Sequence, residues 1–381
     1  MKKLVLVSVL GALLTGCGGG DGGSSDKDSS HNEQRPSAAQ GTIERVSGNT
    51  VTVNGHQYDV ASVSYSTVEL SSSQLEPGML IALSASKTRA TGNHVQLEPT
   101  ITGTITDINR NAGTFRVNGV PLTYSALSPE IENNNWVMVS SLPTANAGYK
   151  VLSVVKFDDV ALSGIFEVEG TVSNLTSDQF KLGAGLTVSY TNDKVEDGPL
   201  ANGVWVEVEG KTSGSTITAT NIEVESYNDI DNDTEIEGLV TWVANDKSSF
   251  ELNYRGRFNV TSQTRFQDGN KNHLVQGTMV EVTTGSSNTA LEIEFDNDGN
   301  DSDDWNDNDI DIEGTVNAIN SSNKSFTIGG SDLNKLDTVY VNQFTEFDDG
   351  LTFSTLTQQA IEVEAYIVNG QYIASEIERL D

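Results

Sequence analysis

Carboxylates are the side chains whose number and spacing in this sequence could do chemistry. The 381 residues contain 54 Asp and Glu against 22 Lys and Arg, and eight of the aspartates fall between 296 and 311. A shorter acidic run lies at 228–233. Carboxylates crowded in this way repel one another unless water and salt keep them apart or a hard cation with oxygen ligands neutralises them. Two interpretations of these runs stay open, a solvated linker and a calcium site.

The calcium interpretation can be assigned to particular oxygens. Glu294, Asp296 and Asp298 alternate with other residues just before Gly299, which is the spacing of the first half of a calcium loop. Trp305 stands where the twelfth position of such a loop would require a bidentate acid. The candidate calcium ligands are Glu294, Asp296, Asp298, Asp301 and Asp303 in the longer run and Asp229, Asp231 and Asp233 in the shorter one. A bound ion would stiffen these segments.

The other reactive residue types form no catalytic pattern. The four histidines lack the spacing of zinc-ligand pairs, and the sequence contains neither a Gly-x-Ser-x-Gly elbow nor a phosphate-binding loop. Paired carboxylates are expected by chance in a chain this acidic. We therefore predict a protein that is not an enzyme and has no catalytic residues, with calcium as its one candidate cofactor.

The single cysteine, Cys17, indicates a different chemistry. Two lysines and an apolar run over 4–14 precede it, and that run is too short to span a bilayer. This order, ending in Leu14-Thr15-Gly16-Cys17, resembles the signal peptide and lipobox of bacterial lipoproteins, in which the cysteine is acylated. Residues 18 and 19 are glycines, not the aspartate that often retains such proteins in the inner membrane. The resemblance therefore implies lipidation of Cys17 and an outer-membrane location, facing the periplasm or the cell surface.

Composition excludes some partners and limits the size of any core. A formal net charge of -32 would repel nucleic acids and anionic lipid headgroups, because both are bound largely through Lys and Arg. The 36% of hydrophobic residues is below the usual share for globular chains, which favours several small cores over a large one. Gly, Ser and Asp dominate 17–40, and this segment is predicted to be a flexible tether.

One pattern occurs five times along the rest of the chain. Each copy opens with a glycine followed by two β-branched or apolar residues, and a run with apolar residues at every second position follows it. The openings begin at Gly41, Gly103, Gly170, Gly238 and Gly314. Alternation of this kind predicts a strand with one buried face. Asn54-Gly55 and Asn118-Gly119 directly follow two of these runs and predict tight hairpin turns, as does Gly329-Gly330.

Each copy is predicted to contain about five short strands, with a helical turn before the fourth. Five strands in some 60 residues must close on themselves or leave exposed edges, so we expect an all-β fold of five tandem small OB-like or SH3-like barrels. We interpret them as a string of separate domains whose neighbours support one another, because units of this size are marginally stable alone.

The predicted boundaries follow the openings and the acidic runs. They are a signal peptide at 1–16, a tether at 17–40, barrel repeats at 41–102, 103–163 and 164–227, an acidic joint at 228–237, a repeat at 238–295, an acidic joint at 296–313 and a last repeat at 314–381.

The repeat resembles a family of small β domains of unknown function that occur in tandem in bacterial secreted proteins and lipoproteins. The Gly-Thr-Val opening, the Phe-x-hydrophobic second strand, the Val-x-Val fourth strand and the closing Ala-x-x-Ile-Glu carry the resemblance. It implies an OB-like fold and no catalytic residue. The second repeat departs from the pattern, because its last strand at 151–155 lacks the closing motif.

Three tryptophans leave the function open. Trp136, Trp205 and Trp242 fit either core packing or a face that stacks on glycans or peptides. The leading hypothesis is a non-catalytic outer-membrane lipoprotein that acts as a spacer or binding scaffold. It would be held to the membrane by its lipid, with a protein or glycan partner at the envelope and no nucleic acid. The alternatives are a calcium-dependent adhesin or glycan-binding surface protein, and an enzyme hidden in one diverged repeat.

Overall fold

The computed structural model describes residues 35–85, 92–144, 148–162, 164–183, 185–228, 230–295, 310–329, 336–343, 345–368 and 370–380. Throughout these ranges the extended elements are β-strands, and the helical pieces are short 3-10 turns, so the predicted all-β class is confirmed. No helix within them is long and apolar enough to cross a membrane. Cys17 and most of the tether lie outside the described residues.

The strands follow the five repeats, which we call units one to five. Unit one holds β1 (Ala38–Ser47), β2 (Thr50–Val53), β3 (His56–Tyr65), β4 (Val68–Leu70), β5 (Leu80–Ala85) and β6 (Asn93–Leu97). Unit two holds β7 (Ile101–Asn109), β8 (Thr114–Val117), β9 (Val120–Thr123), β10 (Trp136–Pro143) and β11 (Tyr149–Lys156). Unit three holds β12 (Glu167–Ser173), β13 (Gln179–Leu182), β14 (Leu186–Ser189), β15 (Val195–Glu196), β16 (Trp205–Ser213) and β17 (Thr216–Val224).

Units four and five repeat the same order of elements. Unit four holds β18 (Thr234–Val243), β19 (Ser249–Leu252), β20 (Gly256–Asn259), β21 (Arg265–Gln267), β22 (Met279–Thr284) and β23 (Ala290–Phe295). Unit five holds β24 (Ile310–Asn320), β25 (Ser325–Gly329), β26 (Asp337–Tyr340), β27 (Glu346–Phe347), β28 (Ala360–Val368) and β29 (Gln371–Arg379).

The predicted hairpin turns are present where the structure describes them. Asn54 and Asn118 have φ angles of 50° and 51°, and the glycines after them also have positive φ, as tight two-residue turns require. Gly330 lies outside the described residues. The expected helical turn before the fourth strand is present in four units, at η1 (Ser72–Gln74), η4 (Asn192–Lys194), η5 (Lys271–His273) and η8 (Phe353–Thr355).

Strand pairing closes in a ring of five strands in several units. In unit five, β24 pairs with β25 and β28, β25 with β26, and β29 with both β26 and β28. Units one and three have the same circuit of pairings. In unit four a single bridge, Asn259 to Thr289, stands where the ladder would close. In unit two, no ladder joins β9 to β11 among the described strands.

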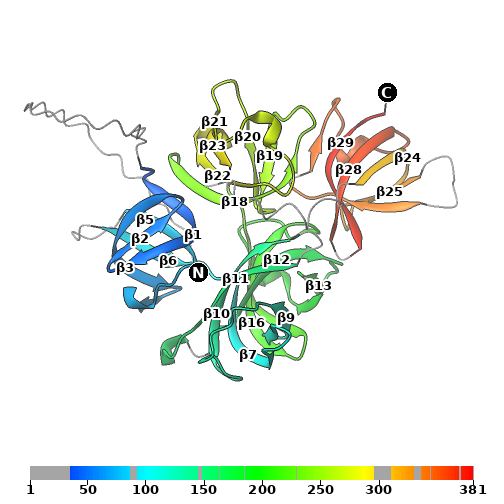
Figure 1. The fold of residues 1–381 in the computed structure, drawn as a ribbon. Helices are drawn as coiled ribbons and strands as arrows, with labels where there is room; N and C mark the ends of the chain where they lie inside the picture. Colours follow the sequence, from blue (N-terminus) through cyan, green and yellow to red (C-terminus); the bar gives the residue numbers. More distant parts are fainter. Residues whose placement is uncertain are drawn as a thin grey trace, which may run out of the picture.

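The units are not independent of one another, because strands of two pairs of units belong to common sheets. In unit one, β1 pairs in parallel with β18 of unit four, Ala38 opposite Thr234 and Gln40 opposite Ile236. In unit two, β7 pairs with β12 of unit three. Figure 1 shows units two and three together below units one, four and five. The exposed edges that a string of barrels would present are thus partly used to pair one unit with another.

A small hydrophobic cluster joins four of the units where they meet. Leu142 of unit two, Trp205 of unit three and Tyr254 of unit four lie in it, and each is at least 93% buried. Val368 and Ile373 bring in unit five. Units two and three share one hydrophobic core, the core of unit one includes Met138 and Val155 of unit two, and units four and five have separate cores.

A core substitution in unit four should therefore loosen unit one. Phe250 is fully buried in the unit-four core, and Phe250→Ala should lower the unfolding free energy by about 3–5 kcal/mol. Because β1 pairs with β18, hydrogen exchange of the amides at 38–40 should accelerate, as measured by mass spectrometry. Phe326→Ala, at the matching position of unit five, should leave these amides protected. Equal exchange at 38–40 in both variants would contradict the shared sheet.

Candidate functional site

Three of the units carry glutamates that face one another across adjacent strands. In unit three, Glu169 of β12 is opposite Glu207 of β16, which is opposite Glu223 of β17. The same register recurs in the later units, and we call each set of three a carboxylate row. The rows are Glu169, Glu207 and Glu223; Glu237, Glu281 and Glu294; and Glu313, Glu362 and Glu378.

Such a row is unfavourable by itself. Residues directly opposite each other on antiparallel strands share a face, and like charges in that position destabilise the pair. A row therefore requires protons, basic side chains or cations to offset the repulsion. The sequence pattern contains the signal, since Glu-x-Glu-Gly or Asp-x-Glu-Gly, Val-Glu-Val or Ile-Glu-Val, and Ile-Glu recur in units three to five. Only the strand register shows that these glutamates are neighbours.

Two glutamates of the unit-three row, Glu169 and Glu207, form a compact carboxylate group with Glu167. Glu167, Glu169 and Glu207 each offer an oxygen within 4.8 Å of the others, and each is at least 93% buried. Three oxygen donors at this spacing could hold a hard cation. Charges this deep in the protein otherwise require close hydrogen-bonded partners.

Those partners come from three different units. The Tyr65 hydroxyl of unit one donates to Glu167 Oε2 at 2.7 Å, and the Trp205 indole of unit three donates to Glu169 Oε2 at 3.1 Å. The Arg255 guanidinium of unit four forms an ion pair with the same Glu169 oxygen, and the Glu169 carboxylate raises the pKa of Arg255. Tyr254 stacks on Trp205 with ring centroids 6.4 Å apart. The β19–β20 hairpin of unit four thus covers the unit-three row.

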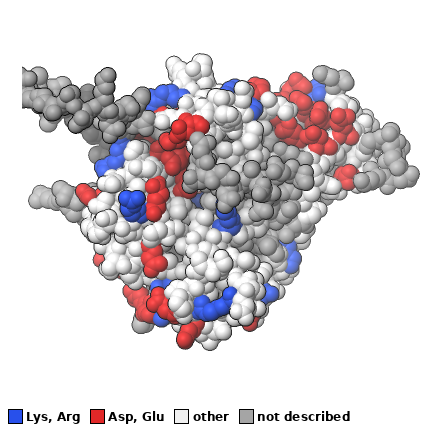
Figure 2. All heavy atoms as spheres, viewed as in Figure 1, with Lys and Arg blue, Asp and Glu red and all other residues white. Residues whose placement is uncertain are grey.

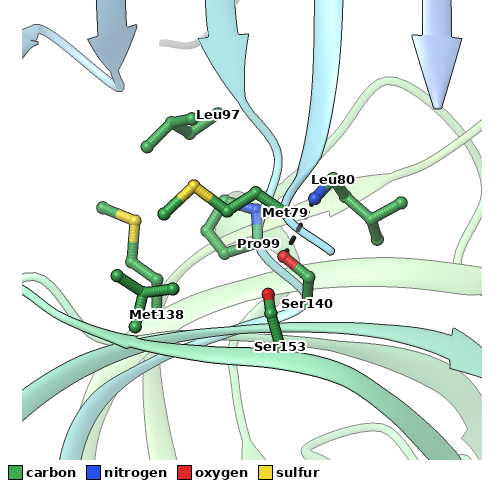
Figure 3. A pocket seen from close by; sticks show the side chains of 8 residues that line it. Met79, Leu80, Leu97, Pro99, Met138, Ser140 and Ser153 are labelled. Atoms are coloured by element: carbon green, nitrogen blue, oxygen red, sulfur yellow. Dashed lines mark hydrogen bonds between the residues drawn. The ribbon is translucent and has the colours of Figure 1, made fainter. Parts of the chain in front are cut away.

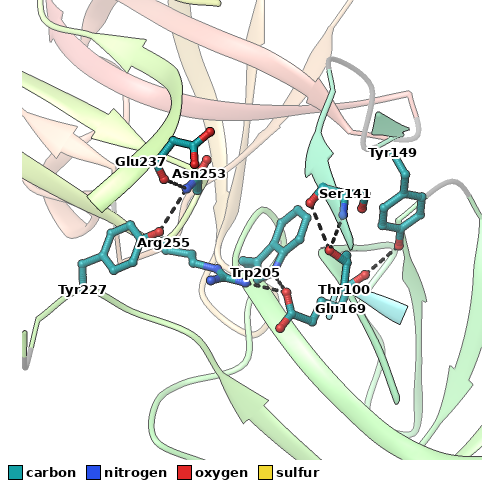
Figure 4. Close-up of polar contacts among 9 residues, drawn as sticks. All are labelled: Thr100, Ser141, Tyr149, Glu169, Trp205, Tyr227, Glu237, Asn253 and Arg255. Atoms are coloured by element: carbon teal, nitrogen blue, oxygen red, sulfur yellow. Dashed lines mark hydrogen bonds and ion pairs between the residues drawn. The ribbon is translucent and has the colours of Figure 1, made fainter. Parts of the chain in front are cut away.

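A cavity of about 40 Å³ opens beside this ion pair, with residues of four units around it. Figure 4 shows Arg255 and Trp205 converging on Glu169, with Glu237 and Asn253 on one side and Thr100 and Ser141 on the other. The volume suffices for a few water molecules. A second cavity, of about 10 Å³, lies between units one and two among Met79, Met138 and Pro99, and it has room for about one water (Figure 3).

The unit-four row is covered by unit one. The amide of Thr42 donates to Glu237 Oε2 at 2.5 Å, and His56 Nε2 lies 3.9 Å from Glu235 Oε2. Burial and the neighbouring carboxylates, Glu235 first among them, raise the pKa of Glu281 to about 9. This face therefore holds a proton on Glu281 at neutral pH when nothing else offsets the charge.

Unit five is covered only in part. Arg257 of unit four donates to Glu346 Oε2 at 2.6 Å, and its guanidinium lies 3.7 Å from the Trp242 ring. The Trp242 indole donates to Glu364 Oε2 at 3.2 Å. Farther along β24, Glu313 is exposed. Figure 2 shows acidic side chains gathered at the upper right, over unit five.

Most of the predicted site residues cannot be located, because they fall in parts of the chain that the structure does not describe. Cys17, Asp229, Asp296, Asp298, Asp301 and Asp303 lie outside the described residues. Asp231 is half-buried and Asp233 is exposed at the start of β18. Glu294 lies on β23, in the unit-four row. The two calcium loops thus stay predictions. The carboxylate rows were missed in the sequence analysis, because an alternating pattern of residues does not show which strands are neighbours.

The tryptophans are packing residues. Trp205 and Trp242 are 3% and 2% exposed, and both indoles donate to glutamates. Trp136 is half-buried, packs against Tyr65 and Phe157, and donates to the carbonyl of Ile165. Of the two readings, core packing is the one that the structure supports.

Removal of the Arg255 side chain should strongly lower the free energy of unfolding. Arg255→Met would leave Glu169 charged and buried without its guanidinium, so we expect a loss of about 3–5 kcal/mol in unfolding free energy. The double variant with Glu169→Gln should recover part of that loss. Arg265→Met is the control, because its ion pair with Glu292 is at the surface and is expected to contribute about 0–1 kcal/mol. Chemical denaturation measures all three, and equal losses for Arg255→Met and Arg265→Met would contradict this role.

The acidic group around Glu376 should make the protein less stable as pH rises. Burial, Asp348, Glu364 and Glu346 raise the pKa of Glu376 to about 8, well above that of an unfolded glutamate. The folded state therefore keeps a proton that the unfolded chain releases, and the resulting stability is complete at low pH and lost as pH rises through about 8. In EDTA-containing buffer, Glu376→Gln should flatten the fall in Tm between pH 5 and 8. An unchanged slope would show that Glu376 ionises normally.

Three segments of the chain, 169–223, 237–294 and 313–378, match the model of a family described as Domain of unknown function (DUF5666). No curated protein matches the chain. One similar solved structure is a multidomain protein with nucleic acid binding domains from Streptococcus pneumoniae TIGR4, at 10% identity over 55% of this chain and 72% of that chain. Its TM-score of 0.14 is too low to support any argument from it. The three units that carry the carboxylate rows are therefore the three that are similar to DUF5666 domains.

Proposed function

We propose that this protein is a non-catalytic lipoprotein of the outer membrane, anchored through Cys17, whose five OB-like units form a binding scaffold in the periplasm or on the cell surface. The sequence at Cys17 supports the anchor. The support for binding is an acidic face of unit five that no other unit covers within the described part of the chain, and we define it by Asp311, Glu313 and Glu362.

The carboxylate rows of units three and four indicate which kind of partner the acidic face of unit five could bind. Strands or hairpins of other units cover the rows of units three and four, and Arg255 supplies the charge for the first of them. In unit five, Asp311 and Glu313 are exposed and Glu362 is half-buried. The third copy of a surface that elsewhere docks protein strands thus faces solvent. We infer a partner that presents an extended segment with arginine and aromatic side chains, as unit four does with Tyr254 and Arg255.

Anchoring is tested by metabolic labelling with palmitate. The wild-type chain should incorporate the label and sediment with outer membranes, and Cys17→Ser should do neither. Protease treatment of intact cells then separates surface display from a periplasmic position. Label incorporation by the Cys17→Ser variant would contradict the proposed anchor.

Binding is tested by cross-linking from unit five. A photoreactive residue placed at Glu362 should give a discrete cross-linked product in intact cells, and the product should be lost when Asp311→Lys and Glu313→Lys are added. The same photoreactive residue at Thr338, which is exposed on β26, is the control. Products of equal yield from both positions, or products unaffected by the lysines, would contradict a partner on this face.

A calcium-dependent adhesin is the second candidate. The density of carboxylates in the rows favours it, because oxygen donors in this number suit a hard divalent cation. It differs from the first candidate in one measurable respect, since cell adhesion should then be abolished by a chelator and restored by calcium.

A further inference from the structure

The contact between units one and four contains more buried polar oxygens than its hydrogen bonds use. Asn54 and Tyr58, from the β2–β3 hairpin of unit one, are 3% and 1% exposed. Neither side-chain atom of Asn54 has a hydrogen-bond partner, and neither has the Tyr58 hydroxyl. Leaving such groups unpaired costs about 1–3 kcal/mol each. A missing ligand would explain why several occur together.

These unpartnered groups face the carboxylates of unit four. A side chain at Gly41 would collide with Asn54 Oδ1 and lie 3.0 Å from Glu237 Oε2, so both oxygens border the same small space. His56, two residues before Tyr58 on the same face of β3, has its Nε2 3.9 Å from Glu235 Oε2. Because Tyr58 lies on the same face of β3 as His56, its hydroxyl is placed on the side of Glu235.

The carboxylates on this face are themselves adjacent. Glu237 is directly opposite Glu281 on the next strand, and Glu235 precedes Glu237 by two residues on the same face of β18. On its other side Glu281 is directly opposite Glu294 of β23. The donor set that results consists of oxygens, which are the ligands of hard cations.

We propose that a divalent cation of the calcium type binds between units one and four, held by Glu235, Glu237 and Glu281 and by the side-chain oxygen of Asn54. The Tyr58 hydroxyl borders the site and can hydrogen-bond to water on the ion. Calcium accepts six to eight oxygen ligands in irregular geometry, which suits donors that come from two units. The ion would join strands far apart in sequence, and the site is distinct from the acidic joints at 228–237 and 296–313.

The first test compares two Glu→Gln variants of the full chain by calorimetric titration with CaCl₂ after EDTA treatment. Glu281→Gln should bind one calcium fewer per chain than the wild type, or bind that ion about tenfold or more weakly. Glu69 is exposed on β4 and belongs to no carboxylate row, so Glu69→Gln should bind as the wild type does. Equal stoichiometry and affinity in Glu281→Gln and the wild type would overturn the proposal.

The second test uses a substitution that should lower the Tm without calcium and increase the stabilisation that calcium gives. Asn54→Asp supplies a charged oxygen, so its Tm should be below that of the wild type in EDTA and should rise more on addition of calcium. Asn118 has the same turn conformation in unit two, and Asn118→Asp should be destabilised equally with and without calcium. If Asn54→Asp also shows no dependence on calcium, or if magnesium alone gives the response, the calcium site is refuted. Neither result affects cross-linking from Glu362, so the two proposals fail independently.

Discussion

Repulsion between glutamates on neighbouring strands is the constraint that the packing of this protein must satisfy. Three units place carboxylates directly opposite one another across three strands. An isolated barrel with such a face would be less stable at neutral pH, because the opposed carboxylates repel each other. Here the hairpins and strands of other units cover two of the faces, and the arginine, tyrosine and backbone donors they bring offset the charge. Packing between units is thus an electrostatic requirement as well as a hydrophobic one.

The same constraint assigns different roles to similar units. Unit four docks its arginines on both neighbours, Arg255 on unit three and Arg257 on unit five, while its own acidic face lies against unit one. Units that share one sequence pattern therefore differ in which neighbours they contact, and two or three side chains on a hairpin determine this difference. Arg255 and Arg257 are thus placed where carboxylates of different units converge, which helps a chain with net charge -32 to pack its units together.

Most of the local structure could be predicted from the sequence, and most of the assembly could not. Alternating residues and the Asn54-Gly55 and Asn118-Gly119 turns identified the strands and hairpins. The short strands β15, β21 and β27 were missed, since each has two or three residues and pairs in parallel with the last strand of its unit. The β1–β18 pairing depends on edges that a repeat pattern leaves equivalent, so no local signal distinguishes this arrangement from a string of domains. The carboxylate rows could be recognised only from the register of the paired strands.

The parallel pairing of β1 with β18 also has a consequence for biogenesis. Ser37 bonds to Asp233 across 196 residues of sequence, so the first strand completes its sheet only after three further units have followed it. During synthesis the N-terminal unit therefore has this strand edge unpaired, and contacts of such long range form slowly. An open strand edge is a template for mispairing. A chaperone that shields strand edges would act on this protein at that stage, before the fourth unit is available to pair with β1.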